Sequence, residues 1–144
     1  MRARITREPI EPAALLADLA TSADGATVLF LGHVRDSNEG REVTGIQYDA
    51  YVEMAERTLE EIAGDAAARL GTSHLALVHR IGELAVGEVS VAIAVASPHR
   101  VEAFDACRFA IEELKRRLPV WKEERYPDRS TQWLPGATAA QDPR

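Results

Sequence analysis

Apolar positions along the chain recur with two different periods, which predicts strands and helices in turn. Runs rich in β-branched and apolar residues predict strands around Arg4 and over residues 26–35, 43–51, 74–82 and 88–97. The last two strands are separated only by residues 83–87, so we expect them to form a hairpin. After Pro119, residues 120–126 are also expected to be extended.

Spacings of three and four residues predict three helices. A short helix is expected to open near Pro12 and carry Leu15, Leu16 and Leu19, and an amphipathic helix is expected over residues 52–69. A long helix is predicted from Val101 to Leu118, where Pro119 ends it. Its buried face is expected to consist of the apolar stripe Val101, Phe104, Cys107, Ile111, Leu114 and Leu118.

This order of elements predicts a single α/β (α+β) domain over residues 1–134. We expect one layer of mostly antiparallel sheet with helices packed on it. Residues 36–42, which include Gly40, are typical of an exposed loop. The polar, alanine-rich residues 135–144 are expected to form a mobile C-terminal tail.

Composition narrows the functional classes. A net charge of −6 argues against general nucleic-acid binding, so a basic cluster is expected to serve a small anion or an acidic partner. The N-terminus lacks a signal-peptide core and the longest apolar run is too short for a bilayer, which predicts a cytoplasmic protein that does not bind membranes. The single cysteine, Cys107, suits a reducing compartment and is interpreted as a packed core thiol rather than a nucleophile.

Only two lysines occur in the chain, Lys115 and Lys122, against fifteen arginines. Lysine is the cation whose pKa shifts on burial and whose amine can carry protons, so this pair is the first candidate for chemistry. Lys115 follows Ile111 by four residues, which places it at the edge of the buried stripe and predicts partial desolvation. Two ordinary explanations remain open: codon bias, and a lysine that snorkels from a helix C-terminus. Arg116 and Arg117 follow Glu112 and Glu113 by four residues and are explained as an exposed ion-paired face.

Three histidine–arginine groupings are further candidates. His99 and Arg100 lie at the start of the long helix, where free backbone N–H groups favour anions. His33 and Arg35 close a strand before the polar loop, and His79 and Arg80 lie within a strand; ordinary surface or core histidines explain each of these groupings as well. No metal-ligand spacing, glycine-rich dinucleotide motif, P-loop or serine-hydrolase motif occurs, so no metal or cofactor is expected.

Several segments together resemble a known family, the large catalytic subunit of molybdopterin synthase. They are GHVRDSNEG, YVEMAERTLEEI, VHRIGEL, PHR and LKRRLPVWKEE, in order from about Ala26 to Trp133. The resemblance implies an α/β hammerhead fold and a sulfurtransferase that acts on cyclic pyranopterin monophosphate. It also implies a homodimer in which each chain binds one small ubiquitin-like sulfur-carrier subunit, giving a heterotetramer. The small subunit's C-terminal thiocarboxylate would supply the two sulfurs of the molybdopterin dithiolene.

The resemblance also assigns roles to individual residues. Lys115 matches the lysine beside the small subunit's terminal glycine, and Lys122 matches a second lysine that holds substrate or stabilises negative charge. Arg35, His99 and Arg100 match the pocket for the pterin phosphate.

Four other positions match substrate-contact segments. Val34, Glu123 and Glu124 flank the matched residues, and His33 stands where the family often has lysine. Histidine is only partly charged at neutral pH, so its share in anion binding is reduced. Two rival functions remain open: a non-catalytic scaffold that docks a ubiquitin-like tail, and a small-anion binding module.

Overall fold

The computed structural model describes residues 2–72 and 74–135, which form three helices and ten strands. In chain order they are β1 (Arg2–Thr6), α1 (Pro12–Leu16), β2 (Ala26–His33), β3 (Ser37–Asn38), β4 (Arg41–Glu42), β5 (Gly45–Ala50), α2 (Val52–Leu70), β6 (His74–Arg80), β7 (Gly82–Ala85), β8 (Val89–Ser97), α3 (Arg100–Arg117), β9 (Val120–Arg125) and β10 (Thr131–Pro135). The mixed α/β class and the main elements agree with the sequence prediction.

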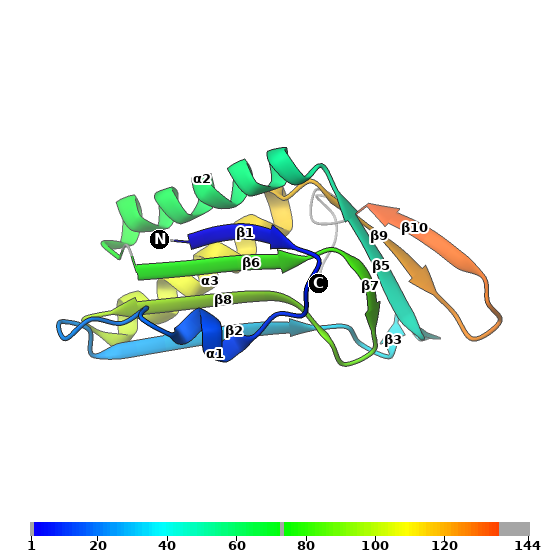
Figure 1. The fold of residues 1–144 in the computed structure, drawn as a ribbon, viewed down its shortest axis with the longest axis horizontal. Helices are drawn as coiled ribbons and strands as arrows, with labels where there is room; N and C mark the ends of the chain where they lie inside the picture. Colours follow the sequence, from blue (N-terminus) through cyan, green and yellow to red (C-terminus); the bar gives the residue numbers. More distant parts are fainter. Residues whose placement is uncertain (1, 73, 136–144) are drawn as a thin grey trace.

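The first sheet has the strand order β1-β6-β8-β2 and carries all three helices. β1 runs parallel to β6, whereas β6 pairs antiparallel with β8 and β8 with β2. Helices α2 and α3 cover one face of this sheet and the short α1 lies against the other (Figure 1). The pairing of β6 with β8 confirms that the two central strands are antiparallel neighbours.

The central strand β8 is buried on both faces, and the size of its side chains differs between them. Val91, Ile93 and Val95 face α2 and α3, where they join Leu59 and Leu114 in the main core. On the opposite face the middle of the strand presents three alanines, at positions 92, 94 and 96, so the backbone around α1 can approach closely. This alternation of large and small residues places most of the apolar burial between the first sheet and the two long helices.

A second four-stranded sheet, β10-β9-β5-β7, corrects the prediction of a single layer. It is fully antiparallel and lies at an angle to the first sheet (Figure 1). The segment expected to be a plain hairpin loop contains β7, which leaves the first sheet at Gly82 (φ 104°) and pairs with β5. The polar loop expected around Gly40 is itself a short hairpin, β3–β4.

The buried face of α3 differs from the predicted stripe. Cys107, Leu114 and Leu118 are buried as expected, but Val101 and Phe104 are 60% and 61% exposed. The helix instead packs through three fully buried alanines, at positions 103, 106 and 110. Alanine has no side-chain entropy to lose and allows close helix–sheet packing, which a pattern of large apolar residues does not reveal.

Two of the elements near the ends of the chain are β10 and α1. Pro135 ends β10, so the expected tail otherwise lies outside the described residues. Near the N-terminus, α1 ends at Leu16, earlier than expected, although Leu19 beyond it is buried. None of the helices in the described ranges is long and apolar enough to cross a membrane.

Candidate active site

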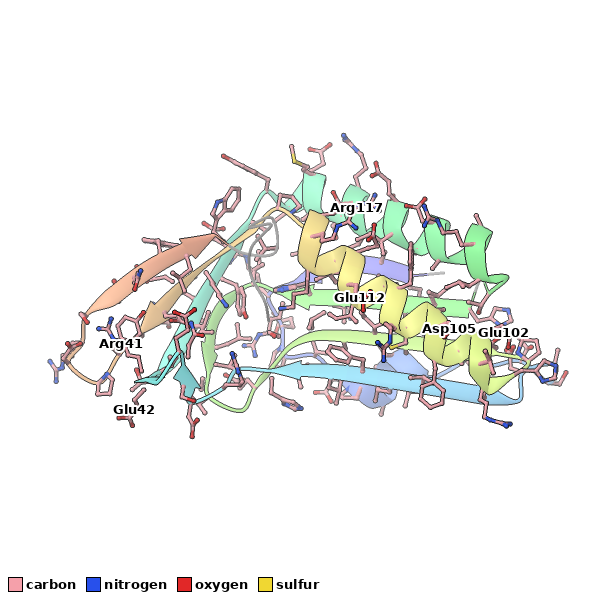
Figure 2. The ribbon with its side chains drawn as sticks, turned by 180° about the vertical axis from the view of Figure 1, so that it is seen from behind. Arg41, Glu42, Glu102, Asp105, Glu112 and Arg117 are labelled. Atoms are coloured by element: carbon pink, nitrogen blue, oxygen red, sulfur yellow. The ribbon has the colours of Figure 1, made fainter. Side chains whose placement is uncertain are left out.

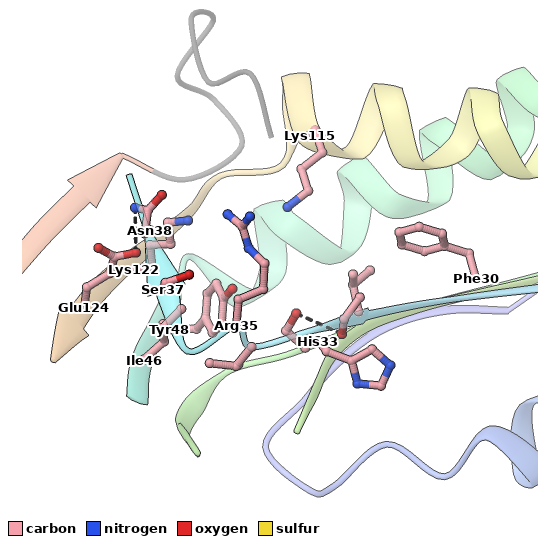
Figure 3. Close-up of a pocket in the computed structure, with 14 residues that line it drawn as sticks. Phe30, His33, Arg35, Ser37, Asn38, Ile46, Tyr48, Lys115, Lys122 and Glu124 are labelled. Carbon is pink, nitrogen blue, oxygen red and sulfur yellow. Dashed lines mark hydrogen bonds between the residues drawn. The ribbon is translucent and has the colours of Figure 1, made fainter. Parts of the chain in front are cut away.

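A cavity of about 450 Å³ opens where the two sheets meet at the C-terminal end of α3 (Figure 3). Both lysines of the chain contribute to it, together with residues of β2, β3, β5 and β8. Its lining consists of Phe30, Gly32, His33, Val34, Arg35, Ser37, Asn38, Ile46, Tyr48, Ser90, Val91, Lys115, Lys122 and Glu124. The site is therefore built from segments that lie far apart in the sequence, from Phe30 to Glu124.

Three cationic side chains reach this cavity from three different elements. Lys115 comes from the last turn of α3, Lys122 from β9 and Arg35 from the segment after β2. Arg35 and Lys115 point into the same space in Figure 3, and Arg35 forms no salt bridge within residues 2–72 and 74–135. Three cations converging on one concave site favour an anionic ligand such as a phosphate.

The two lysines differ in burial, which corrects one prediction. Lys122 is only 8% exposed and lies opposite Tyr48 in the register of β9 and β5. Lys115 is exposed, although the sequence pattern predicted partial burial. The reason is the rotation of the buried face of α3 toward its alanines, which moves the edge of the apolar stripe away from Lys115.

A buried carboxylate, Glu124, organises the wall opposite α3. It is 3% exposed and accepts hydrogen bonds from Asn38 Nδ2 at 2.8 Å and from the Tyr126 hydroxyl at 3.1 Å. Burial, followed by the hydrogen bond to Glu124, raises the pKa of Tyr126 and keeps its hydroxyl a donor. The guanidinium of Arg41 stacks on the Tyr126 ring, with Cζ 3.3 Å from the centroid. These contacts join the β3–β4 hairpin to β9.

A buried histidine supports the cavity from behind. His79 packs edge-to-face against Tyr48, with ring centroids 5.1 Å apart, and its Nδ1–H donates to Arg80 O at 2.8 Å. Burial, and to a lesser extent the charge of Lys115, lowers the pKa of His79 to about 4. The ring is therefore neutral at physiological pH and serves as a packed support for Tyr48.

The residues around His33 reach the cavity in different ways. The His33 ring donates from Nδ1 to Gly87 O at 3.1 Å, which holds it against the loop between β7 and β8. Val34 is buried, and its backbone exchanges hydrogen bonds with that loop: its N–H donates to Glu88 O and its carbonyl accepts from Gly87 N–H. The local anchoring of Val34 leaves the following Arg35 side chain directed into the cavity (Figure 3).

Three of the predicted site residues lie outside the cavity. His99 and Arg100 are exposed at the N-terminus of α3, about 22 Å from Lys115 along the helix axis. Figure 2 shows the same separation, with Glu102 near one end of α3 and Arg117 near the other. Glu123 occupies the opposite face of β9 from Lys122 and Glu124, where it lies 3.9 Å from Arg125. One chain therefore does not bring His99 and Arg100 to the pocket of Arg35, as the sequence had predicted.

Other candidates have structural roles. Arg117 bridges α3 to α2 through Glu61 and Asp65, and Arg116 pairs with Glu113 rather than Glu112. Burial raises the pKa of the Cys107 thiol to about 11, which opposes a role as a nucleophile. No group of three or more histidine, cysteine or acidic side chains within the described ranges is arranged to hold a metal ion.

Sequence reasoning missed five polar or aromatic residues of the cavity: Phe30, Ser37, Asn38, Tyr48 and Ser90. Tyr48 was visible only as one residue of an alternating strand, and Asn38 only as part of a polar loop. The register of β5 with β9 and the hairpin turn at Gly40 bring them to the lysines. Neither can be read from the spacing of residues along the chain.

Comparisons with known proteins identify the family. Residues 5–117 match the family described as MoaE protein. The molybdopterin synthase catalytic subunit 1 of Mycobacterium tuberculosis is 40% identical over 131 residues, which cover 91% of this chain and 88% of that protein. The catalytic subunit of Coccidioides immitis is 43% identical over 122 residues, and the match covers 85% of this chain but 62% of that longer protein.

Solved structures agree with this assignment. Molybdopterin synthase from Staphylococcus aureus superposes with a TM-score of 0.86 at 36% identity, covering 93% of this chain and 97% of that chain. These likenesses confirm the resemblance that the sequence motifs had indicated. The chain belongs to the MoaE protein family, the family of molybdopterin synthase catalytic subunits.

Proposed function

We propose that this chain catalyses the transfer of two sulfurs to cyclic pyranopterin monophosphate, forming the dithiolene of molybdopterin. The cavity that brings Lys115, Lys122 and Arg35 together is the observation that carries the proposal. Phosphate, thiocarboxylate and the leaving oxygen are all anionic, so one cationic cavity can bind substrate and stabilise the developing charge. The proposal requires no resident metal or cofactor.

The sulfur donor is a small ubiquitin-like partner with a C-terminal thiocarboxylate. A structure with the same fold, from Helicobacter pylori, is described as a complex of subunits 1 and 2 of molybdopterin-converting factor and supports a two-subunit assembly. Lys115 is exposed at the mouth of the cavity, where an extended tail can approach it. The more buried Lys122 is then left for the substrate.

The chemistry runs through a covalent link between substrate and small subunit. The thiocarboxylate sulfur attacks a carbon of the substrate side chain, forming a C–S bond as the bond from that carbon to an oxygen breaks. The oxygen takes the electron pair and a proton and leaves as water, and the partner stays attached as a thioester. Opening of the cyclic phosphate follows as one of its ester bonds breaks. The released oxygen keeps the electron pair, and Lys122 stabilises its negative charge and gives it a proton. Water then cleaves the thioester, so the sulfur stays on the substrate and the partner leaves as a carboxylate. A second donor delivers the other sulfur.

His99 and Arg100 are assigned to the cavity of a second copy in a homodimer. They lie too far from Lys115 to share its ligand within one chain. Strand β2 is an edge of the first sheet, and the neighbouring Val101 and Phe104 are exposed apolar side chains, which suits an interface between copies. Mixing Lys115→Ala with Arg100→Ala chains would then restore activity, because one cavity of each mixed dimer keeps all its residues. No recovery after verified exchange of chains would contradict this assignment.

The central test is a reconstituted assay with cyclic pyranopterin monophosphate and the thiocarboxylated small subunit, scored for dithiolene. Lys115→Ala is expected to lower the rate about 100-fold or more because a proton-transfer group is lost. Arg116→Ala is the matched control: this exposed neighbour is paired with Glu113 and should leave the rate unchanged. A normal rate for a folded, partner-binding Lys115→Ala chain would contradict the assignment.

Two rival functions give different results in the same experiment. A scaffold for a ubiquitin-like tail would bind carboxylate and thiocarboxylate tails equally and tolerate loss of Lys122. A small-anion binding module would bind pterin phosphate with an affinity independent of the small subunit. For location we propose the cytoplasm, whose reducing conditions suit the free Cys107.

A further inference from the structure

The β3–β4 hairpin places one amide side chain, that of Asn38, on the wall of the cavity. The hairpin has a two-residue turn whose central residues, Glu39 and Gly40, both have positive φ, 52° and 79°. Such a turn matches the twist of the strands and fixes their pairing, here Asn38 opposite Arg41. Asn38 is therefore held at a defined register position.

The orientation of the Asn38 amide is set by its neighbour. Its Nδ2 donates to Glu124 Oε2 at 2.8 Å, and a carboxylate can only accept hydrogen bonds. The amide nitrogen must therefore face Glu124, and Oδ1 must face the other way. Arg41, stacked on Tyr126, anchors the opposite strand of the hairpin to the same wall.

The Oδ1 atom of Asn38, which faces away from Glu124, is a buried hydrogen-bond acceptor without a donor among the described residues. Within residues 2–72 and 74–135, Asn38 Oδ1 is buried and receives no hydrogen bond. Leaving a buried acceptor unsatisfied costs about 1–3 kcal/mol, so such an atom at the edge of a binding cavity points to a group supplied by the ligand. An anionic phosphate oxygen cannot satisfy it, because both atoms accept hydrogen bonds and only an N–H or O–H donor fits.

We propose that Asn38 recognises the heterocycle of the substrate: its Oδ1 accepts a hydrogen bond from a ring or exocyclic N–H, while the cationic groups hold the phosphate. This inference rests on the proposed function, since a pterin is a fused heterocycle that carries N–H donors. It divides the cavity into a cationic part around Arg35 and Lys115 and an acceptor on the β3–β4 wall. Asn38 is thereby a specificity-determining residue.

The division is tested by binding each half of the substrate separately to the full-length protein. Asn38→Ala should weaken the binding of a neutral pterin without phosphate about tenfold, the loss expected for one buried hydrogen bond. Binding of inorganic phosphate should change by no more than about twofold, because surface-exposed cations elsewhere in the cavity hold it. Calorimetry or quenching of pterin fluorescence measures pterin binding, and calorimetry measures phosphate binding.

Two further variants separate the loss of pterin recognition by Asn38 from a general disturbance of the cavity wall around Glu124. Tyr126→Phe removes the hydrogen bond that the Tyr126 hydroxyl donates to Glu124 but keeps Asn38 Oδ1, so this variant should bind the pterin normally. Asn38→Gln keeps an amide on the hairpin but displaces its oxygen by one methylene. It should therefore weaken pterin binding as Asn38→Ala does. Unchanged pterin binding by both Asn38 variants, or equal weakening of pterin and phosphate, would overturn the inference.

The inference and the proposed function fail in distinguishable ways. If the unmodified chain forms dithiolene and the Asn38 variants bind pterin normally, only the role of Asn38 is wrong. If Asn38→Ala weakens pterin binding but the unmodified chain with its thiocarboxylated partner forms no dithiolene, recognition stands and the sulfur-transfer function fails.

Discussion

The two large sheets of the molecule bury different kinds of side chain. The first sheet is covered by helices and buries valine, isoleucine and alanine on both faces of β8. The second sheet buries a small apolar cluster that includes Ile46 and Leu84, but it also buries the charged side chains of Lys122 and Glu124. Apolar burial stabilises the fold, whereas buried polar groups must be held by specific partners and contribute less.

This contrast separates the source of stability from the source of activity. The cavity lies at the junction, so the rigid first sheet and α3 position Lys115 while the second sheet supplies Lys122 and the Glu124 network. Changes in the first sheet layer should therefore act on the free energy of unfolding. Changes in the second sheet should act on binding and turnover.

The largest effect is expected from Leu59→Ala in the helix layer over the first sheet. Leu59 is fully buried against β6 and β8, so the lost transfer energy and the cavity left behind should lower the free energy of unfolding by about 3 kcal/mol. Urea denaturation measures the loss, and the rate per folded molecule should stay normal. Leu16→Ala, at an exposed leucine of α1, is the control and should cost much less. Equal losses for the two would contradict the assignment of stability to this layer.

The next effect concerns turnover and tests the second sheet. Lys122→Arg keeps the positive charge, but arginine does not release its proton at ordinary pH and its larger head must fit a buried position. We expect the rate of dithiolene formation to fall about 100-fold while inorganic phosphate still binds. Arg125→Lys, on the opposite face of β9, is the matched control. A full rate for Lys122→Arg would mean that this position supplies charge alone.

A third prediction concerns pH and the neutral His79 between the two sheets. The pKa of His79 is about 4 in the folded chain, whereas its ordinary value, which applies to the unfolded chain, is 6.5. Between these two pH values the unfolded chain therefore binds more protons than the folded chain. Stability from this residue is thus fully present above pH 6.5 and is lost as the pH falls toward 4, by about 2 kcal/mol at pH 5. His79→Asn retains a donor for Arg80 O but does not titrate, so it should flatten the pH dependence measured by urea unfolding. An unchanged slope would assign the acid sensitivity between pH 6.5 and 4 to other groups.

Sequence patterns predicted the first sheet much better than the second. The periodicity of β6, β8 and α2 depends on nearby residues, and the strands and helix were found close to the expected ranges. The short strands β3, β4, β7 and β10 are specified by long-range pairing and turn geometry, so the polar or brief segments that form them had no periodic signal. The exposed Val101 and Phe104 show a further limit: apolar spacing does not tell which side of a helix packs when alanines are available.

For the site, the two lysines and Arg35 were predicted and do share one cavity. His99 and Arg100 were predicted from the same resemblance but lie at the other end of α3, because a resemblance identifies functional positions without placing them in space. Tyr48 and Asn38 depend on strand register and a hairpin turn. These are three-dimensional features that the spacing of residue types does not carry.

The smallest effect is expected at Arg41, on the exposed strand of the hairpin. Its guanidinium stacks on Tyr126 and donates to Ser130 Oγ at 3.1 Å, contacts worth about 0.5–1 kcal/mol at an exposed site. Arg41→Ala should loosen the hairpin while Asn38 stays bonded to Glu124, so pterin affinity should fall about threefold, less than for Asn38→Ala. Fluorescence titration measures the affinity, and Glu42→Ala, the exposed next residue of the same strand, is the control. A loss as large as that of Asn38→Ala would mean that the second sheet holds its polar wall through the exposed stacking contact rather than through the buried carboxylate.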